Sequence, residues 1–222
     1  MPASTTTAPT LRVARIKERC AVLGPGLRAV IWFHGCSMNC PECIAREMNR
    51  SPEHLAFTPV EMFEWVRSVP DIEGVTLSGG EPFEQDRQAL LAFLMLLRRE
   101  SDLSVFCYTG YTLQELRAAG DAALNERILG CVDLLIDGRY YDETRNRGLR
   151  WRGSENQQVY FLTGRYAHLR DELLAARDRS IEIEVSLGGK LMIAGVPGPG
   201  FVRRLAEQLD GRGAVLNFDT MK

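Results

Sequence analysis

The hydrophobic positions of this chain fall into short β-branched runs that alternate with stretches of helical spacing. The short runs predict strands over residues 28–33, 74–78, 103–108, 132–136 and 159–162. The helical spacing predicts helices over residues 58–66, 85–100, 121–129 and 165–177. Strands that alternate with helices in this way indicate an α/β fold with a mostly parallel sheet.

Two helix starts carry a capping box, in which a threonine and a glutamate three residues later satisfy each other's free backbone groups. Thr58 precedes Pro59 and Glu61, and Thr112 precedes Glu115. The remaining pattern predicts a short helix over residues 42–49, a hairpin of residues 181–187 and 190–194, and a last helix from about residue 200 to residue 210.

Four distinctive turns of the sequence each follow a predicted strand. A cysteine-containing loop follows residues 28–33, and the sequences Gly-Gly-Glu-Pro at 79–82, Tyr-Thr-Gly at 108–110 and Asp-Gly-Arg at 137–139 follow the next three strands. The carboxyl ends of parallel strands share one rim of a sheet, where α/β proteins build their sites. We therefore expect these four turns to converge.

Composition bounds the class of protein. The chain has 222 residues, 45% of them hydrophobic, which is enough for one core. We expect residues 1–10 to be a disordered N-terminus and residues 11–222 to form a single domain. The net charge of −2 gives no indication of a nucleic-acid partner. The longest apolar run, residues 89–97, is too short to cross a membrane, and no secretory signal is visible, so we expect a cytoplasmic protein.

The strongest chemical signal is a group of three cysteines with the spacing C-x3-C-x2-C, formed by Cys36, Cys40 and Cys43. Structural zinc sites and simple electron-carrying 4Fe–4S clusters normally use four protein ligands. Three thiolates on a cubane leave one iron open to a substrate or cofactor. The alternative is a Cys3His zinc site completed by His34, which lies two residues before Cys36.

The other cysteines, Cys20, Cys107 and Cys131, are scattered through the sequence. We interpret them as small hydrophobic residues rather than as a second ligand group.

The turn formed by Gly79, Gly80, Glu81 and Pro82 is the second signal. Paired glycines let the backbone turn sharply and approach a ligand closely. Glu81 adds a carboxylate, and Pro82 fixes the exit of the turn. This combination suits an amino acid's ammonium group.

Together, the cysteine triad and this turn resemble the radical S-adenosylmethionine superfamily. Four further segments are similar to the glycyl-radical-enzyme activases, in particular the activating enzymes of anaerobic (class III) ribonucleotide reductase. They are residues 24–28, 108–112, 133–138 and 152–157. The resemblance covers about residues 20–165 and implies a partial, open (β/α) barrel with mostly parallel strands, while residues 166–222 form an α/β extension without a recognised motif.

The resemblance also implies roles. Cys36, Cys40 and Cys43 would be the catalytic cluster ligands, and Gly79, Gly80, Glu81 and Pro82 would bind the methionyl amino group of S-adenosylmethionine. Arg139 would bind the cofactor's carboxylate, and Asp137 and Thr109 would line the same rim. Alternatives to these roles are a surface ion pair for Arg139 and a turn-stabilising role for Asp137.

The implied reaction is reductive cleavage of S-adenosylmethionine at a 4Fe–4S cluster, giving a 5′-deoxyadenosyl radical that removes hydrogen from a glycine of a glycyl radical enzyme. A flavodoxin- or ferredoxin-type protein would donate the electron. Two other functions stay open: a stand-alone radical enzyme that modifies a peptide or metabolite, and a non-enzymatic zinc or iron–sulfur module.

A basic stretch with one tryptophan follows the predicted fourth strand. It contains Trp151 and the arginines Arg145, Arg147, Arg150 and Arg152. Its two interpretations are a docking surface for the partner's glycine loop and a solvated hairpin loop.

Overall fold

The structure is a computed structural model that describes residues 9–41, 43–46, 49, 51–146, 148–177, 180–185, 187, 189, 191–197 and 200–212. Most of the expected disordered N-terminus, residues 1–8, lies outside the described residues. So do residues 42, 47 and 48 of the short helix expected over residues 42–49.

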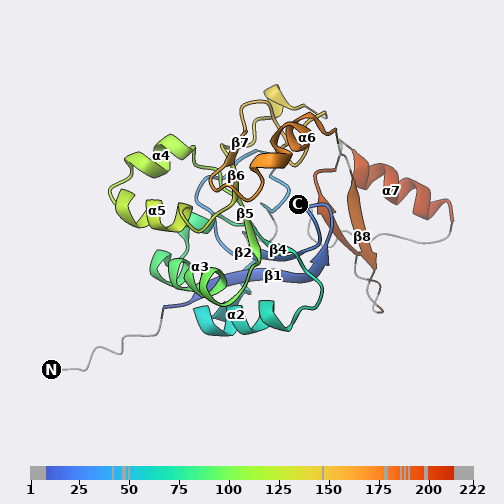
Figure 1. The fold of residues 1–222 in the computed structure, drawn as a ribbon. Helices are drawn as coiled ribbons and strands as arrows, with labels where there is room; N and C mark the ends of the chain where they lie inside the picture. The colour runs from blue at the N-terminus through green and yellow to red at the C-terminus, as the bar shows by residue number, and fades with distance from the viewer. Residues whose placement is uncertain are drawn as a thin grey trace.

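A seven-stranded mixed sheet with the order β3-β1-β2-β4-β5-β6-β7 forms the centre of the molecule (Figure 1). Its four inner strands are parallel: β2 (Arg28–Phe33), β4 (Gly74–Gly79), β5 (Ser104–Tyr108) and β6 (Leu134–Asp137). The outer strands pair antiparallel: β1 (Leu11–Cys20), β3 (Leu55–Phe57) and β7 (Gln158–Phe161). The α/β class and the mostly parallel centre are thus confirmed. Among the described strands, β3 and β7 are edges of this sheet, which does not close into a barrel.

The helices expected over residues 58–66, 85–100, 121–129 and 200–210 form, and the one expected over residues 165–177 forms only in part. Both predicted capping boxes are present. The helices are α2 (Pro59–Ser68), α3 (Arg87–Glu100), α4 (Leu113–Ala118), α5 (Ala122–Leu129), α6 (Arg170–Ala175) and α7 (Phe201–Asp210). Short 3-10 turns are η1 (Pro82–Glu84), η2 (Asp142–Thr144) and η3 (Ala167–Leu169). Thr58 and Thr112 each accept from the backbone of the glutamate three residues later, which bonds back to the threonine N–H.

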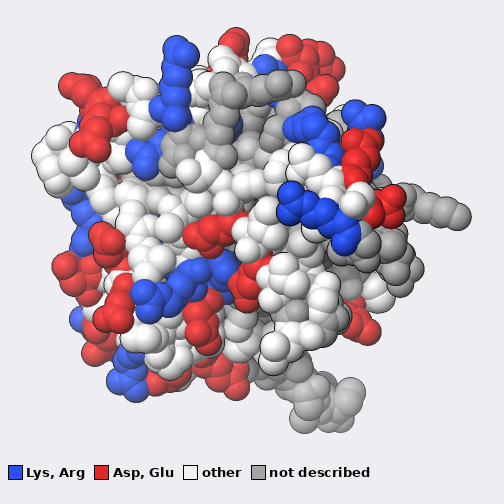
Figure 2. Space-filling view, turned by 90° about the vertical axis from the view of Figure 1, so that its right-hand side faces the viewer, with Lys and Arg blue, Asp and Glu red and all other residues white. Residues whose placement is uncertain are grey.

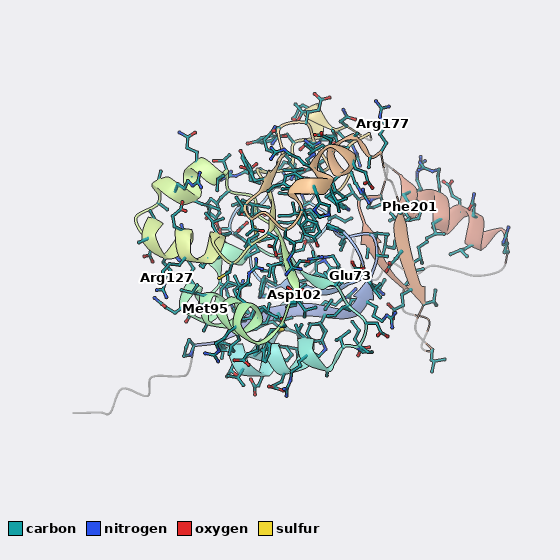
Figure 3. All side chains as sticks on the ribbon, in the orientation of Figure 1. Glu73, Met95, Asp102, Arg127, Arg177 and Phe201 are labelled. Atoms are coloured by element: carbon teal, nitrogen blue, oxygen red, sulfur yellow. The ribbon has the colours of Figure 1, made fainter. Side chains whose placement is uncertain are left out.

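One face of the sheet carries the main hydrophobic core. Ile31, Leu77 and Val105 point to this face, where helices α2, α3 and α5 cover them. The helices also contact one another: Arg127 of α5 reaches the sulfur of Met95 on α3 at 3.9 Å (Figure 3). Because successive side chains of a strand point to opposite faces, the alternate residues of the same strands point away from these helices.

The opposite face is covered by elements from the C-terminal part of the chain. The hairpin of β8 (Ile181–Val185) and β9 (Leu191–Gly195) places the buried Ala194 against Val30 and Trp32 of β2. Phe106 of β5 lies in one buried cluster with Leu134 of β6, with Trp151 and with Leu173 of α6. In Figure 1 the hairpin and α7 lie to the right of the main sheet.

Trp151 is therefore a buried residue, 6% exposed and 5.3 Å from Phe106 between ring centroids. Arg150 lies over its indole ring at 4.5 Å. The basic stretch thus anchors itself to the sheet through its aromatic residue, while Arg147 lies outside the described residues.

Acidic and basic side chains are interspersed over the face that carries the hairpin (Figure 2). This mixture agrees with the small net charge of the chain. Within the described residues, no helix combines the length and the apolar character that crossing a bilayer requires.

Candidate functional site

The cysteine loop and the Gly-Gly-Glu-Pro turn are joined through their backbones. Gly80 N–H donates to the carbonyl of Phe33 at 2.7 Å, and Glu81 N–H donates to the carbonyl of Gly35 at 3.0 Å. The glycines are required here: Gly79 has φ 88°, and a Cβ on Gly80 would lie 2.3 Å from the Gly35 oxygen. The chain entering Cys36 therefore lies directly against this turn.

The two following turns join the same rim. Thr109 N–H donates to the carbonyl of Ile136 at 2.9 Å, and Gly138 N–H donates to the carbonyl of Tyr111 at 3.1 Å. Met38 of the cysteine loop approaches so closely that a Cβ on Gly110 would lie 2.2 Å from its sulfur. The expected convergence of the four turns is thus observed.

Glu81 ties the end of β4 to the end of β5. Its Oε1 accepts from Thr109 Oγ1 at 2.7 Å and from Phe83 N–H at 3.1 Å, and its Oε2 accepts from Gly110 N–H at 2.8 Å. Burial raises the pKa of this carboxyl to about 7, against the lowering effect of the three hydrogen bonds. The side chain of Glu81 is therefore occupied by internal donors, and residues 80–82 of the turn are buried.

The three cysteines lie on one partly exposed loop. Burial raises the pKa of Cys36 to about 11, and it also raises the pKa of Cys43. Smaller electrostatic contributions to these pKa values come from Cys43 on Cys36 and from Cys40 on Cys43.

The thiols of Cys36, Cys40 and Cys43 are donors of the type that an iron–sulfur cluster requires, but within the described part of the chain they are not assembled into a ligand group. Among the described residues, no three His, Cys, Asp or Glu side chains are grouped to hold a metal ion. The raised pKa values favour neutral thiols, and metal binding requires their deprotonation. Cys36, Cys40 and Cys43 would hold a cluster through a local rearrangement of their loop.

His34, the residue considered as a fourth zinc ligand, is engaged elsewhere. Its Nε2 lies 2.6 Å from the carbonyl oxygen of Ser51, and its ring stacks on His54 with a centroid distance of 4.7 Å. The geometry gives no support to a Cys3His site.

The other predicted cofactor residues occupy different environments. Thr109 is buried and bonded to Glu81, while Arg139 is exposed and lies close enough to Glu115 to interact electrostatically. Asp137 is buried and accepts from Leu113 N–H at 2.7 Å and from Gln158 N–H at 3.2 Å. The turn-stabilising interpretation of Asp137 accounts for both contacts, and its cofactor role stays a prediction.

Two residues that sequence reasoning did not single out hold the cysteine loop. Glu84 accepts from Ser37, and Gln85 donates to the carbonyl of His34 at 2.9 Å. Both closely follow the recognised turn, and this adjacency is the one signal that could have drawn attention to them.

A cleft of about 460 Å³ opens next to the rim, between η1 and helices α4 and α5. Its lining includes Glu84, Arg87, Tyr111, Glu115 and Asn125. None of the predicted cofactor residues lines this cleft. The cleft lies beside the converging turns, and its lining includes Tyr111, which directly follows one of them.

Comparisons with known proteins identify the family of this chain. A family model described as a 4Fe-4S single cluster domain matches residues 22–160. The anaerobic ribonucleoside-triphosphate reductase-activating protein of Escherichia coli (strain K12) is 30% identical over 147 residues, covering 64% of this chain and 92% of that protein. The protein of the same name from Pasteurella multocida (strain Pm70) is 32% identical over 148 residues, covering 64% and 92%. The protein of the same name from Enterobacteria phage T4 is 29% identical over 146 residues, covering 64% of this chain and 88% of that protein. The family match ends before helix α6.

Proposed function

Because the chain belongs to the 4Fe-4S single cluster family and to the family of anaerobic ribonucleoside-triphosphate reductase-activating proteins, we propose that it activates a glycyl radical enzyme. The partner would be an anaerobic ribonucleotide reductase, and the cofactor S-adenosylmethionine. The superfamily would be that of the radical S-adenosylmethionine enzymes, with the open sheet as its partial barrel.

The observation that carries the proposal is the direct contact between the cysteine loop and the glycine turn. Glu81 N–H bonds to the carbonyl of Gly35, one residue before Cys36. A cofactor held by the backbone of the glycine turn would thus lie beside a cluster held by the cysteines. This proximity is what a reaction between cluster and cofactor requires.

When bound, a reduced 4Fe–4S cluster supplies the electron that splits S-adenosylmethionine into methionine and a 5′-deoxyadenosyl radical, which takes a hydrogen atom from the partner's glycine. Cys36, Cys40 and Cys43 would hold the three ligated irons. The backbone of Gly79, Gly80 and Pro82 would receive the ammonium group.

Other residues of the rim would orient the cofactor. The exposed guanidinium of Arg139 suits a bidentate contact with the cofactor's carboxylate. Thr109 and Asp137 would act indirectly, because Thr109 holds Glu81 and Asp137 joins α4 to β7. A flavodoxin- or ferredoxin-type protein in the cytoplasm would reduce the cluster.

Anaerobic reconstitution tests the proposal. The wild-type protein should bind about four irons and one cluster per chain, form 5′-deoxyadenosine with a reductant, and produce a glycyl-radical doublet in electron paramagnetic resonance with its reductase partner. Cys36→Ala, Cys40→Ala and Cys43→Ala should each abolish 5′-deoxyadenosine formation. Cys20→Ala, Cys107→Ala and Cys131→Ala are the matched controls and should keep their iron.

Two results would redirect the assignment. Iron uptake and cofactor cleavage without a doublet on any reductase would favour a stand-alone enzyme that modifies a peptide or metabolite. One bound zinc and a colourless protein would favour a non-enzymatic module.

A further inference from the structure

We propose that Glu84 is a positioning residue that clamps the cysteine loop against the glycine turn. Its carboxylate holds the residue after Cys36 from two sides: Oε2 accepts from Ser37 N–H at 2.8 Å, and Oε1 accepts from Ser37 Oγ at 2.5 Å. This inference rests on the proposed function, because it assigns Glu84 to the binding of the cluster.

The clamp has a fixed base. Glu84 ends the 3-10 turn η1, and its N–H donates to the Glu81 carbonyl at 3.2 Å. The next residue, Gln85, is 5% exposed and holds the chain on the other side of Cys36, through the carbonyl of His34. Two consecutive residues thus fix the backbone before and after the first cysteine.

The clamp also reaches the next turn of the rim. Tyr111 donates its hydroxyl to Glu84 Oε1 at 2.9 Å. Burial and the bond to Glu84 raise the pKa of Tyr111 to about 12, so the phenol remains a donor at neutral pH. Glu84 therefore connects three segments: the cysteine loop, η1 and the loop between β5 and α4.

The position matters because the cysteine thiols are not assembled into a ligand group among the described residues. A loop that must rearrange on binding loses conformational entropy, and a loop fixed next to Cys36 has less to lose. Mutation of residues that orient metal ligands typically lowers metal affinity by about 10–100-fold.

The test compares Glu84→Ala with Glu84→Gln. The amide introduced by Glu84→Gln can still accept and donate bonds with Ser37 and Tyr111, whereas alanine removes them. We expect reconstituted Glu84→Ala to release iron to a chelator about tenfold faster than wild type, and Glu84→Gln to stay within about threefold. Glu64→Ala, which removes an exposed carboxylate from α2, should match wild type.

Hydrogen exchange of the apoprotein gives a readout that needs no cluster. The Ser37 amide should lose protection in Glu84→Ala and keep it in Glu84→Gln. Unchanged Ser37 protection and iron release in Glu84→Ala would overturn the clamp, as would a Glu84→Gln variant that behaves like alanine. If the wild-type protein takes up no cluster, the proposed function fails, and the exchange data still decide whether the clamp exists.

Discussion

Thr109 donates its hydroxyl to the buried carboxylate of Glu81 across the ends of two neighbouring parallel strands, at 2.7 Å. This bond makes the glycine turn and the following rim turn one unit. The carboxyl group of Glu81 is buried, and a buried negative charge is costly unless hydrogen-bond donors surround it. The stability of the rim therefore depends on the protonation of Glu81.

The pKa of Glu81 is raised from 4.5 to about 7, and the sign of the effect follows from linkage. Its protonated form is favoured by folding, so its contribution is complete below pH 4.5 and is lost as the pH rises to about 7. The loss amounts to roughly 3 kcal/mol. Urea unfolding of the apoprotein between pH 4.5 and 7.5 should show this decline in wild type and not in Glu81→Gln. Parallel curves for the two proteins would contradict the raised pKa.

Glu81→Ala tests the same residue in the loaded protein. The variant leaves the N–H groups of Phe83 and Gly110 without their acceptor, so the glycine turn loses its support. We expect S-adenosylmethionine affinity, titrated against the cluster's absorption, to fall about tenfold while iron content is retained. Loss of iron with unchanged cofactor affinity would assign Glu81 to the cluster instead.

Arg28 is fully buried, and all the acceptors bonded to it are neutral oxygens. Its guanidinium donates to Thr76 Oγ1 at 2.8 Å, to Ser104 Oγ at 2.9 Å and to three backbone carbonyls. Arg28→Met would remove these five hydrogen bonds, with an expected loss of about 3 kcal/mol in the free energy of unfolding. Arg67→Met on the exposed side of α2 should change it by less than about 0.5 kcal/mol. A similar small effect at both positions would show that the Arg28 bonds contribute little.

Much of this architecture could be predicted because its signals are local. The capping boxes at Thr58 and Thr112 and the β-branched strands each lie within a few residues of sequence. The convergence of the rim turns followed from strand direction alone. Strand β1 was not predicted, since its irregular pairing with β2 between Val13 and Arg15 and between Lys17 and Cys20 breaks the alternation of buried positions.

The clamp residues were not predictable for a different reason. Glu84 lies 47 positions from its partner Ser37 in the sequence. Gln85 lies 51 positions from His34 and 73 positions from Arg12, and it accepts a hydrogen bond from the N–H of Arg12. No local pattern encodes contacts of that separation. The burial of Trp151 was unpredictable for the same reason, because its partner Phe106 lies on a strand that is distant in the sequence.

Cluster uptake should depend on pH through the thiols. Burial raises the pKa of Cys36 to about 11 and that of Cys43 in the same direction, so binding must displace protons. The rate of anaerobic iron and sulfide uptake by the apoprotein should therefore rise as the pH increases from neutral to moderately alkaline values. Cys107→Ala, which removes a thiol from the core, should show the same profile. A rate independent of pH would mean that the thiols are already ionised in the apoprotein.

The β8–β9 hairpin should detach when charge is placed on its inner side. Ala194, 3% exposed, faces Val30 and Trp32, while Lys17 and Ala21 of the β1 region bind Glu184 and Glu182 of β8. Ala194→Asp would bury an unpaired carboxylate, which costs more than these peripheral contacts supply. We expect faster hydrogen exchange in β8 and β9 and a red shift of Trp32 fluorescence. Ile183→Asp, on the exposed side of the hairpin, should leave the hydrogen exchange and the fluorescence unchanged. Equal responses of the two variants would show that the hairpin does not cover β2 in solution.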